Sequence, residues 1–399
     1  MNKTLPTASI LIAILFCMSA LSGISSDMYI AAFPEIGHYF GVSAPLIKWT
    51  LSLFFIGLAC SQLIYGPLSD YIGRKKIMTV GFVIFIIGSL LCLICKEFSV
   101  FLLGRFVQGC GVGATVCLSR AILRDVFDGA PLAKALSYIG MGLAIVPAVA
   151  PVLGAYIQSL IGWRYEFLFM LLYTLILQIV ATLIIPETNT YIKQYKKTLK
   201  VIVSEYRTIL VDPVFFINVL IASFIISVIY IFYSMTTFYF QDRYHWDAVD
   251  YSRINILLAA ALFSGRKINI FMTQRMSNNK VILLGSILSL LTAVLMALFS
   301  WLNVNPVITL LLPTALYAVS GGIIFSNTFV GATAKYTKIA GSVSSLYGFT
   351  QMLTVFALVS LSSILGLASI ASIYSLLFIF SLLSIIMIKW LIKQTNATV

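Results

Sequence analysis

Two charged residues stand inside otherwise apolar stretches of this sequence. Asp27 interrupts the first stretch near its end, and Arg105 interrupts the fourth. A charge at the centre of a bilayer costs about 2.5–3.5 kcal/mol on insertion scales, so we infer that both residues have a role. Burial in a partly dry cavity disfavours the ionised form of a carboxyl. Asp27 is therefore predicted to bind and release a proton.

Few other groups in the sequence could do chemistry. Cys92 and Cys95 have C-x-x-C spacing, but no His or Cys follows nearby to complete a metal site. His38 and His245 have neither ligand spacing nor a carboxylate partner. We expect no metal, no cofactor and no enzymatic activity.

The composition places the chain in a membrane. Of its 399 residues, 60% are hydrophobic and only 10% are charged, against about 25% in soluble proteins. The formal charge of +13 would suggest nucleic acid as a partner of a soluble protein. In a membrane protein it indicates Lys and Arg retained on the cytoplasmic side, so a bilayer and no nucleic acid is expected.

Apolar runs long enough to cross a bilayer predict an all-α membrane protein with 12 transmembrane helices. Six runs centre near residues 18, 56, 86, 110, 146 and 175, and six near 227, 261, 291, 318, 352 and 380. This pattern predicts an N-terminal six-helix half (1–187), a basic linker (188–211) and a C-terminal six-helix half (212–399). Such pseudo-symmetric halves are typical of transporters that bind substrate near the midplane between them.

The positions of the basic residues predict the orientation. With the N-terminus inside, most of the 26 Lys and Arg residues fall in inside loops, including the 188–211 linker. Both termini are therefore expected in the cytoplasm.

A loop motif follows the second predicted span. The segment Gly66-Pro67-Leu68-Ser69-Asp70-Tyr71-Ile72-Gly73-Arg74-Lys75-Lys76 resembles the G-x-L-x-D-x-x-G-R-[KR]-[KR] motif of the major facilitator superfamily. The resemblance implies the major facilitator fold and a cytoplasmic gate formed by Gly66, Asp70, Gly73 and Arg74. Asp70 is expected at a helix N-terminus of the other half, near Gly341, where the helix dipole favours a carboxylate. A positively charged loop with no gating role is the alternative.

Further segments resemble the Bcr/CflA-like subfamily of twelve-span drug:proton antiporters. They are Ser26–Pro34, Leu103–Gly109, Arg120–Asp125, Ala150–Ala155 and Gly341–Gln351. Two alanines replace glycines of the helix-five antiporter motif, and Glu166 is unusual for the subfamily. The resemblance implies a monomer in a bacterial inner membrane that transports small molecules and protons.

The coupling hypothesis is competition at one carboxyl. Asp27 binds a proton from outside and releases it when substrate enters from inside. Arg105 holds the polar network and senses the charge of Asp27, directly or through water or Gln108. The alternatives are an interfacial carboxylate for Asp27 and a tie to backbone carbonyls for Arg105.

An aromatic cavity for amphiphilic, including cationic, substrates is predicted between the halves. Its expected lining is Tyr29, Gln108, Asn218, Tyr230, Tyr233, Asn327 and Gln351. The alternative for some aromatic residues of this region is an interfacial belt.

Small residues and prolines mark the fifth span as a bendable seal. The predicted hinge residues are Gly140, Pro147, Pro151 and Gly154, because proline kinks a helix and small residues allow close packing. Ordinary small-residue packing is the alternative.

The sequence therefore predicts proton-coupled efflux of small amphiphilic molecules, either drugs or an endogenous metabolite. One alternative is proton-coupled uptake or export of a nutrient or siderophore. A remote one is an intramembrane transferase, although the chain has two His residues and no paired acids within a span. The substrate, the direction, the proton stoichiometry and whether Asp27 is the sole proton site stay open.

Overall fold

The computed structural model describes residues 6–127, 131, 135, 138–139, 145–189, 199–336, 340–366 and 369–397, and these residues contain helices but no strand. Eleven helical spans within them are long and apolar enough to cross a membrane. A shorter apolar helix, Val146–Ile161, lies where the fifth span is predicted. The all-helical prediction is confirmed, and the helices fit the twelve expected crossings.

The first crossing is broken near its end. It consists of α1 (Ala8–Asp27), the short 3₁₀ helix η1 (Ile30–Ala32) and α2 (Phe33–Phe40). The other helices of this half are α3 (Ala44–Ile72), α4 (Arg74–Ile94), α5 (Phe98–Val126), α7 (Val146–Ile161) and α8 (Arg164–Ile184). Asp27 is the last residue of α1, so its side chain lies at the point where the helix is interrupted.

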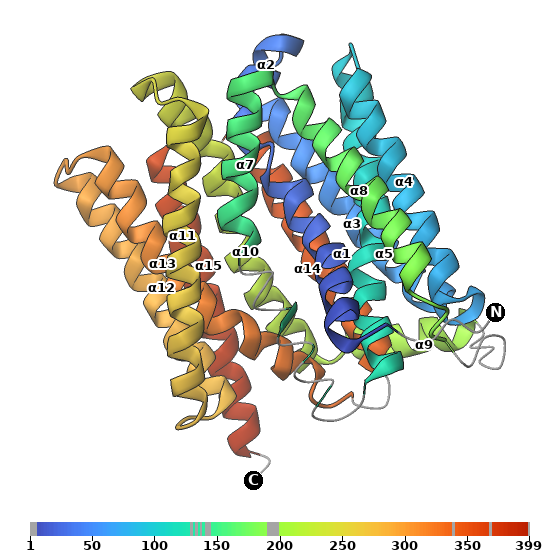
Figure 1. Cartoon of the computed structure of the whole chain (residues 1–399). Coiled ribbons are helices and arrows are strands. Elements are labelled where there is room, and N and C mark those ends of the chain that lie inside the picture. The colour runs from blue at the N-terminus through green and yellow to red at the C-terminus, as the bar shows by residue number, and fades with distance from the viewer. Residues whose placement is uncertain are drawn as a thin grey trace.

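A helix of the linker, α9 (Leu199–Leu210), precedes the second half. The later helices are α10 (Pro213–Tyr244), α11 (Ala248–Thr273), α12 (Asn278–Trp301), α13 (Pro306–Thr333), α14 (Ala340–Ile364) and α15 (Ile370–Ala397). In Figure 1, α9 lies at the same end of the bundle as both chain termini. We call this the linker end, and the opposite end, which carries α2, the far end.

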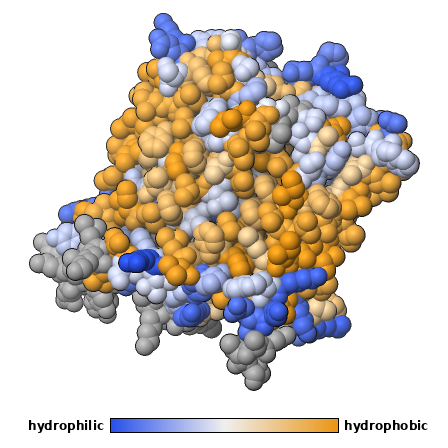
Figure 2. Space-filling model, turned by 180° about the vertical axis from the view of Figure 1, so that it is seen from behind, coloured by the Kyte–Doolittle hydropathy of each residue, from blue (hydrophilic) through white to orange (hydrophobic). Residues whose placement is uncertain are grey.

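The outer surface is apolar between two polar ends. Figure 2 shows a broad hydrophobic belt, with hydrophilic residues gathered towards the far end and the linker end. Exposed apolar side chains such as Ile87, Ile176 and Leu291 contribute to this surface. A soluble protein rarely exposes so large an apolar area, whereas a bilayer solvates it.

The two halves meet along pairs of helices from opposite halves. α3 packs against α14, α7 packs against α11, and α10 contacts η1 and α2. Figure 1 shows α14 in the middle of the molecule, where it packs against α3. Residues on α1, α3, α7 and α10 therefore have access to the interface between the halves.

Candidate functional site

Asp27 lies at the interface between the halves. Only 4% of the residue is exposed. Its Oδ1 accepts hydrogen bonds from the neighbouring Ser26 hydroxyl at 2.6 Å and from the Tyr230 hydroxyl of α10 at 3.1 Å. A carboxyl of the first half is thus bonded to a side chain of the second half. The protonation state of Asp27 can therefore alter a contact that joins the halves.

Arg105 is fully buried within the first half, at 0% exposure. Its Nη1 donates to Gln108 Oε1 at 2.5 Å, and its Nη2 donates to the Ser25 carbonyl at 2.9 Å. Its guanidinium carbon lies 4.2 Å from the Tyr29 ring centroid and 4.6 Å from that of Phe54. Among the described residues no carboxylate lies within salt-bridge distance of it.

These contacts link Arg105 to the backbone of α1 two residues before Asp27. They support the prediction that Arg105 holds a polar network with Gln108, whose Nε2 donates to Ser89 Oγ at 2.7 Å. They also match the alternative of a tie to a backbone carbonyl, since the Ser25 carbonyl is one of its acceptors. The contacts of Arg105 are therefore compatible with both the polar-network role and the structural tie to a backbone carbonyl.

Three of the predicted cavity tyrosines lie near these two charges. Tyr230 packs its ring 4.7 Å from Phe55 of α3, and the ring of Tyr233 lies 6.5 Å from that of Tyr230. Tyr29 is fully buried, and its hydroxyl lies 2.8 Å from Thr50 Oγ1. The structure therefore gathers Tyr230 and Tyr233 beside Asp27, and Tyr29 and Gln108 beside Arg105.

The other predicted cavity residues lie apart from this cluster. Asn218 donates to the Val214 carbonyl within α10 at 2.8 Å. Asn327 Nδ2 donates to Asn269 Oδ1 at 2.5 Å, which joins α13 to α11. Gln351, on α14, is 5% exposed. No hydrogen bond described for these three residues reaches Asp27 or Arg105, so their place in a substrate cavity stays a prediction.

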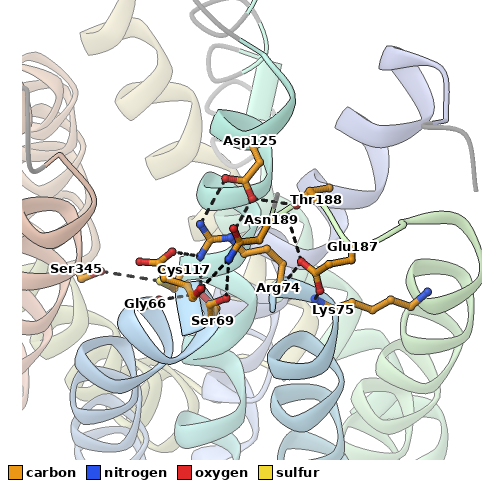
Figure 3. Close-up of polar contacts among 11 residues, drawn as sticks. Gly66, Ser69, Arg74, Lys75, Cys117, Asp125, Glu187, Thr188, Asn189 and Ser345 are labelled. Atoms are coloured by element: carbon orange, nitrogen blue, oxygen red, sulfur yellow. Dashed lines mark hydrogen bonds and ion pairs between the residues drawn. The ribbon is translucent and has the colours of Figure 1, made fainter. Parts of the chain in front are cut away.

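The predicted gate motif forms an ion-pair network at the linker end. Figure 3 shows Arg74 at its centre, with Nε 2.9 Å from Asp125 Oδ2 and Nη1 2.6 Å from Ser69 Oγ. Arg74 Nη1 also lies 2.5 Å from Asp70 Oδ1. The backbone N–H of Arg74 donates to Glu187 at 2.8 Å. The network ties α3, α4 and α5 to the chain after α8, all within the first half.

Both gate glycines have a physical reason to be glycine. Gly73 has φ 112° and ψ 148°, a conformation that a side chain would strain. A Cβ on Gly66 would lie 3.0 Å from Ser345 Oγ of α14. Cys117 Sγ lies 3.9 Å from the same oxygen. Gly66 therefore permits the first half to approach the second at the linker end.

The contacts described for Asp70 lie within the first half and the start of the linker. Its carboxylate, 55% exposed, pairs with Arg74, and its carbonyl accepts from Asn189 at 2.8 Å. Residues 337–339, which precede α14, lie outside the described residues, and the surroundings of Gly341 are not described either. The predicted contact of Asp70 with that helix end stays a prediction.

The fifth span is described from Ile145 onward. Pro147 stands in the first turn of α7, Pro151 lies inside the helix, and a Cβ on Gly154 would collide with the Met28 carbonyl of the first crossing. The backbones of α7 and the first crossing therefore touch directly. Gly140 lies outside the described residues.

Among the described residues, the structure also buries charged side chains that the sequence does not predict as sites, and two of them lie in the first half. Lys48 of α3 is 3% exposed, and Glu166 of α8 is 0% exposed. Both lie close to helix starts, where the hydropathy pattern suggests a solvated boundary. The one sequence feature that pointed to Glu166 is that a glutamate there is unusual for the subfamily that the chain resembles.

Comparison with known proteins identifies relatives of the chain. The family model described as Major Facilitator Superfamily matches residues 15–359. An "Uncharacterized MFS-type transporter YdgK" of Bacillus subtilis is 30% identical over 86% of both chains. "Multidrug resistance protein D" of Escherichia coli is 26% identical over 88% of both. Among solved structures, a D-xylose-proton symporter superposes with a TM-score of 0.78 at 14% identity, over 96% of this chain and 97% of the other.

Proposed function

The chain belongs to the major facilitator superfamily of membrane transporters, and we propose that it exports small amphiphilic molecules in exchange for protons. The observation that carries the proposal is the hydrogen bond between Asp27 and Tyr230, which joins a buried carboxyl of one half to the other half. The resemblance to a protein named for multidrug resistance supports drug-like substrates. We place the chain in the Bcr/CflA-like subfamily on the sequence segments alone.

Alternating access requires that substrate and proton favour different arrangements of the halves. Protonation removes the charge of Asp27 and changes the acceptor that Tyr230 and Ser26 contact. Substrate that enters between the halves competes for the same groups. Arg105 registers the change because it holds the Ser25 carbonyl, on the same helix as Asp27. In this scheme a proton enters on one side as substrate leaves on that side.

We propose that the linker end is cytoplasmic and that the far end faces outwards in a bacterial inner membrane. The concentration of Lys and Arg at the linker end supports this orientation. The helix order supports halves at 1–187 and 212–399 joined by the linker 188–211. We propose that the chain acts as a monomer.

Transport of ethidium in proteoliposomes tests the coupling. Asp27→Asn is expected to abolish ethidium movement driven by a pH gradient, because the amide cannot exchange a proton. Asp242→Asn replaces an exposed carboxylate at the far end of α10 and serves as the matched control, with transport retained. Undiminished pH-driven transport in Asp27→Asn would refute the coupling role.

The sign of the gradient tests the direction. In vesicles with the linker end outside, acidification of the interior is expected to drive ethidium inwards, because efflux from the cytoplasm corresponds to uptake into such vesicles. Movement of ethidium and protons in the same direction would identify a symporter instead.

A further inference from the structure

Glu166 is a buried carboxyl that the coupling scheme above does not use. It lies in the first turn of α8 at the far end and is 0% exposed. Neither Oε1 nor Oε2 has a hydrogen-bond partner among the described residues. Buried carboxyls that serve structure alone are hydrogen-bonded or paired in most proteins, so this one needs an explanation.

The surroundings of Glu166 offer little to stabilise a negative charge. Its neighbour Phe167 is fully buried among Tyr29, Phe101 and Trp163. The N-terminus of α8 favours a carboxylate, but this effect is small beside the cost of burying an unpaired charge. An ionised carboxylate without partners in apolar surroundings costs several kcal/mol, and a neutral carboxyl costs less.

Two charged groups act electrostatically on Glu166. One is Glu35 of α2, which is exposed at the far end, and the other is the buried Arg105 of α5. Arg105 Nε also has no hydrogen-bond partner among the described residues. The Arg105 guanidinium carbon lies 5.9 Å from the ring centroid of Phe167, the residue next to Glu166. An unpartnered N–H of a cation and an unpartnered carboxyl thus lie in the same buried region of the first half.

The other titratable groups near this site already have partners. The Tyr29 hydroxyl bonds Thr50, and Arg164 donates to the Cys95 carbonyl at 2.8 Å while it stacks on Tyr39. The Cys92 thiol of α4 lies 3.8 Å from the Phe101 carbonyl. The one titratable residue within α7 (Val146–Ile161) is Tyr156, and it is exposed. Asp27, on α1, bonds Ser26 and Tyr230.

We propose that Glu166 is a second proton-binding carboxyl, protonated in this conformation and paired with Arg105 Nε once it is deprotonated. On release, the O–H bond of Glu166 breaks and the proton passes to water at the far end, beside Glu35. The carboxylate then accepts the Nε–H of Arg105. Uptake reverses these steps and leaves Arg105 without a carboxylate partner, as is found among the described residues.

This inference rests on the proton coupling proposed above and adds a second carboxyl to it. Asp27 and Glu166 then lie on opposite sides of Arg105. Asp27 lies towards the second half through Tyr230, and Glu166 lies within the first half towards the far end. Arg105 contacts α1 and, when Glu166 is ionised, binds α8. The proton count per cycle then exceeds that of a single carboxyl.

The experiment uses infrared difference spectra of the full-length protein in lipid nanodiscs, recorded between acidic and alkaline pH, with the hydrogen ion itself as the probe. Protonated carboxyls absorb in a region clear of carboxylates and amides. The wild type is expected to lose two buried-carboxyl signals as the pH rises. Glu166→Gln is expected to lack one of them, and Asp27→Asn the other.

Three further variants keep the result decisive. Glu97→Gln removes an exposed carboxylate before α5 and is expected to match the wild type. Glu166→Met removes the buried polar group without adding an unpaired amide, so it reports on the signal if Glu166→Gln fails to fold. Arg105→Lys is expected to shift the Glu166 signal, because lysine keeps the charge and loses Nε.

The possible outcomes separate the two proposals. Spectra of Glu166→Gln and Glu166→Met that equal the wild-type spectrum would overturn the assignment of Glu166. Loss of one signal in these variants with no change in Asp27→Asn would support Glu166 and contradict the role of Asp27. A Glu166 signal that does not move in Arg105→Lys would overturn the pairing with Arg105.

Discussion

Asp212 fastens two helices of the second half with one carboxylate. Its Oδ1 accepts from the Val214 N–H at 3.0 Å and caps α10. Its Oδ2 accepts from the Tyr336 hydroxyl at 2.6 Å and from Lys335 Nζ at 3.2 Å, just after α13. Burial alone would raise the pKa of Asp212, but these hydrogen bonds outweigh burial and hold the pKa below 3.8.

Because the pKa of Asp212 is lower in the folded protein than in the unfolded chain, ionised Asp212 stabilises the fold at pH values above its unfolded-state pKa. This stabilisation is lost as the pH falls through the folded-state pKa. Asp212→Asn is expected to lower the free energy of unfolding by about 1 kcal/mol at neutral pH. Thermal unfolding midpoints in detergent across a pH series provide the measurement. The difference from wild type should shrink below pH 3.8, and a constant difference would contradict this account.

The sequence predicts which charged residues form the site better than it predicts the residues that they contact. Asp27 and Arg105 were identifiable because a charge in an apolar run is conspicuous. Tyr230 as the partner of Asp27 was not, because it lies 203 positions away and the pairing depends on how the halves meet. The sequence does not predict Glu166 as a site, because a charge at the boundary of a span is ordinary and the burial of this residue follows from packing.

At the scale of elements, α7 and the first crossing show how closely two helices approach. A Cβ on Gly154 would meet the backbone carbonyl of Met28, which cannot rotate away. A Cβ on Gly66 would meet the Ser345 hydroxyl at 3.0 Å, which can. The two glycines are therefore unequal, although both lie where helices touch.

Gly154→Ala is expected to destabilise the protein by about 1–3 kcal/mol, because the new methyl group forces two backbones apart. Gly66→Ala is the matched control and should cost clearly less. Unfolding midpoints of both variants in the same detergent give the comparison. Equal midpoints would mean that α7 and the first crossing do not touch as closely as the structure places them.

Hydropathy predicted the helices well because a bilayer demands long apolar runs. The break of the first crossing into α1, η1 and α2 could not be predicted in this way, since residues 8–40 form one stretch of high mean hydropathy. The region near residue 261, crowded by Arg253 and Arg266, nevertheless forms the continuous helix α11. The break in the first crossing and the continuity of α11 both depend on packing against other helices. Hydropathy averaged along the chain carries no information on that packing.

At the scale of the whole molecule, the halves touch at the linker end through Cys117 and Gly66 of the first half and Ser345 of the second. The Sγ–Oγ distance of 3.9 Å between Cys117 and Ser345 suits the short Cβ separation of a disulfide. All six cysteines fall within residues 17–117, and they are free.

Ser345→Cys is expected to form a disulfide with the native Cys117 on mild oxidation and to lock the linker end shut. Ethidium transport should fall on oxidation and recover with dithiothreitol, and peptide mass spectrometry should find the linked pair. The double variant Cys117→Ser/Ser345→Cys cannot make the bond and controls for the substitution. Full transport by the oxidised, cross-linked protein would show that this contact does not open during the cycle.

The seam between α3 and α14 has contacts near both of its ends. Ser363 donates to the Pro45 carbonyl at the far end, and Gly66 meets Ser345 at the linker end. A rigid tilt of α3 against α14 would separate the contact at one end of the seam and bring the contact at the other end closer. A continuous pore would require both pairs to part at once. Rigid tilting of α3 against α14 would therefore keep the membrane closed to ions without a separate plug.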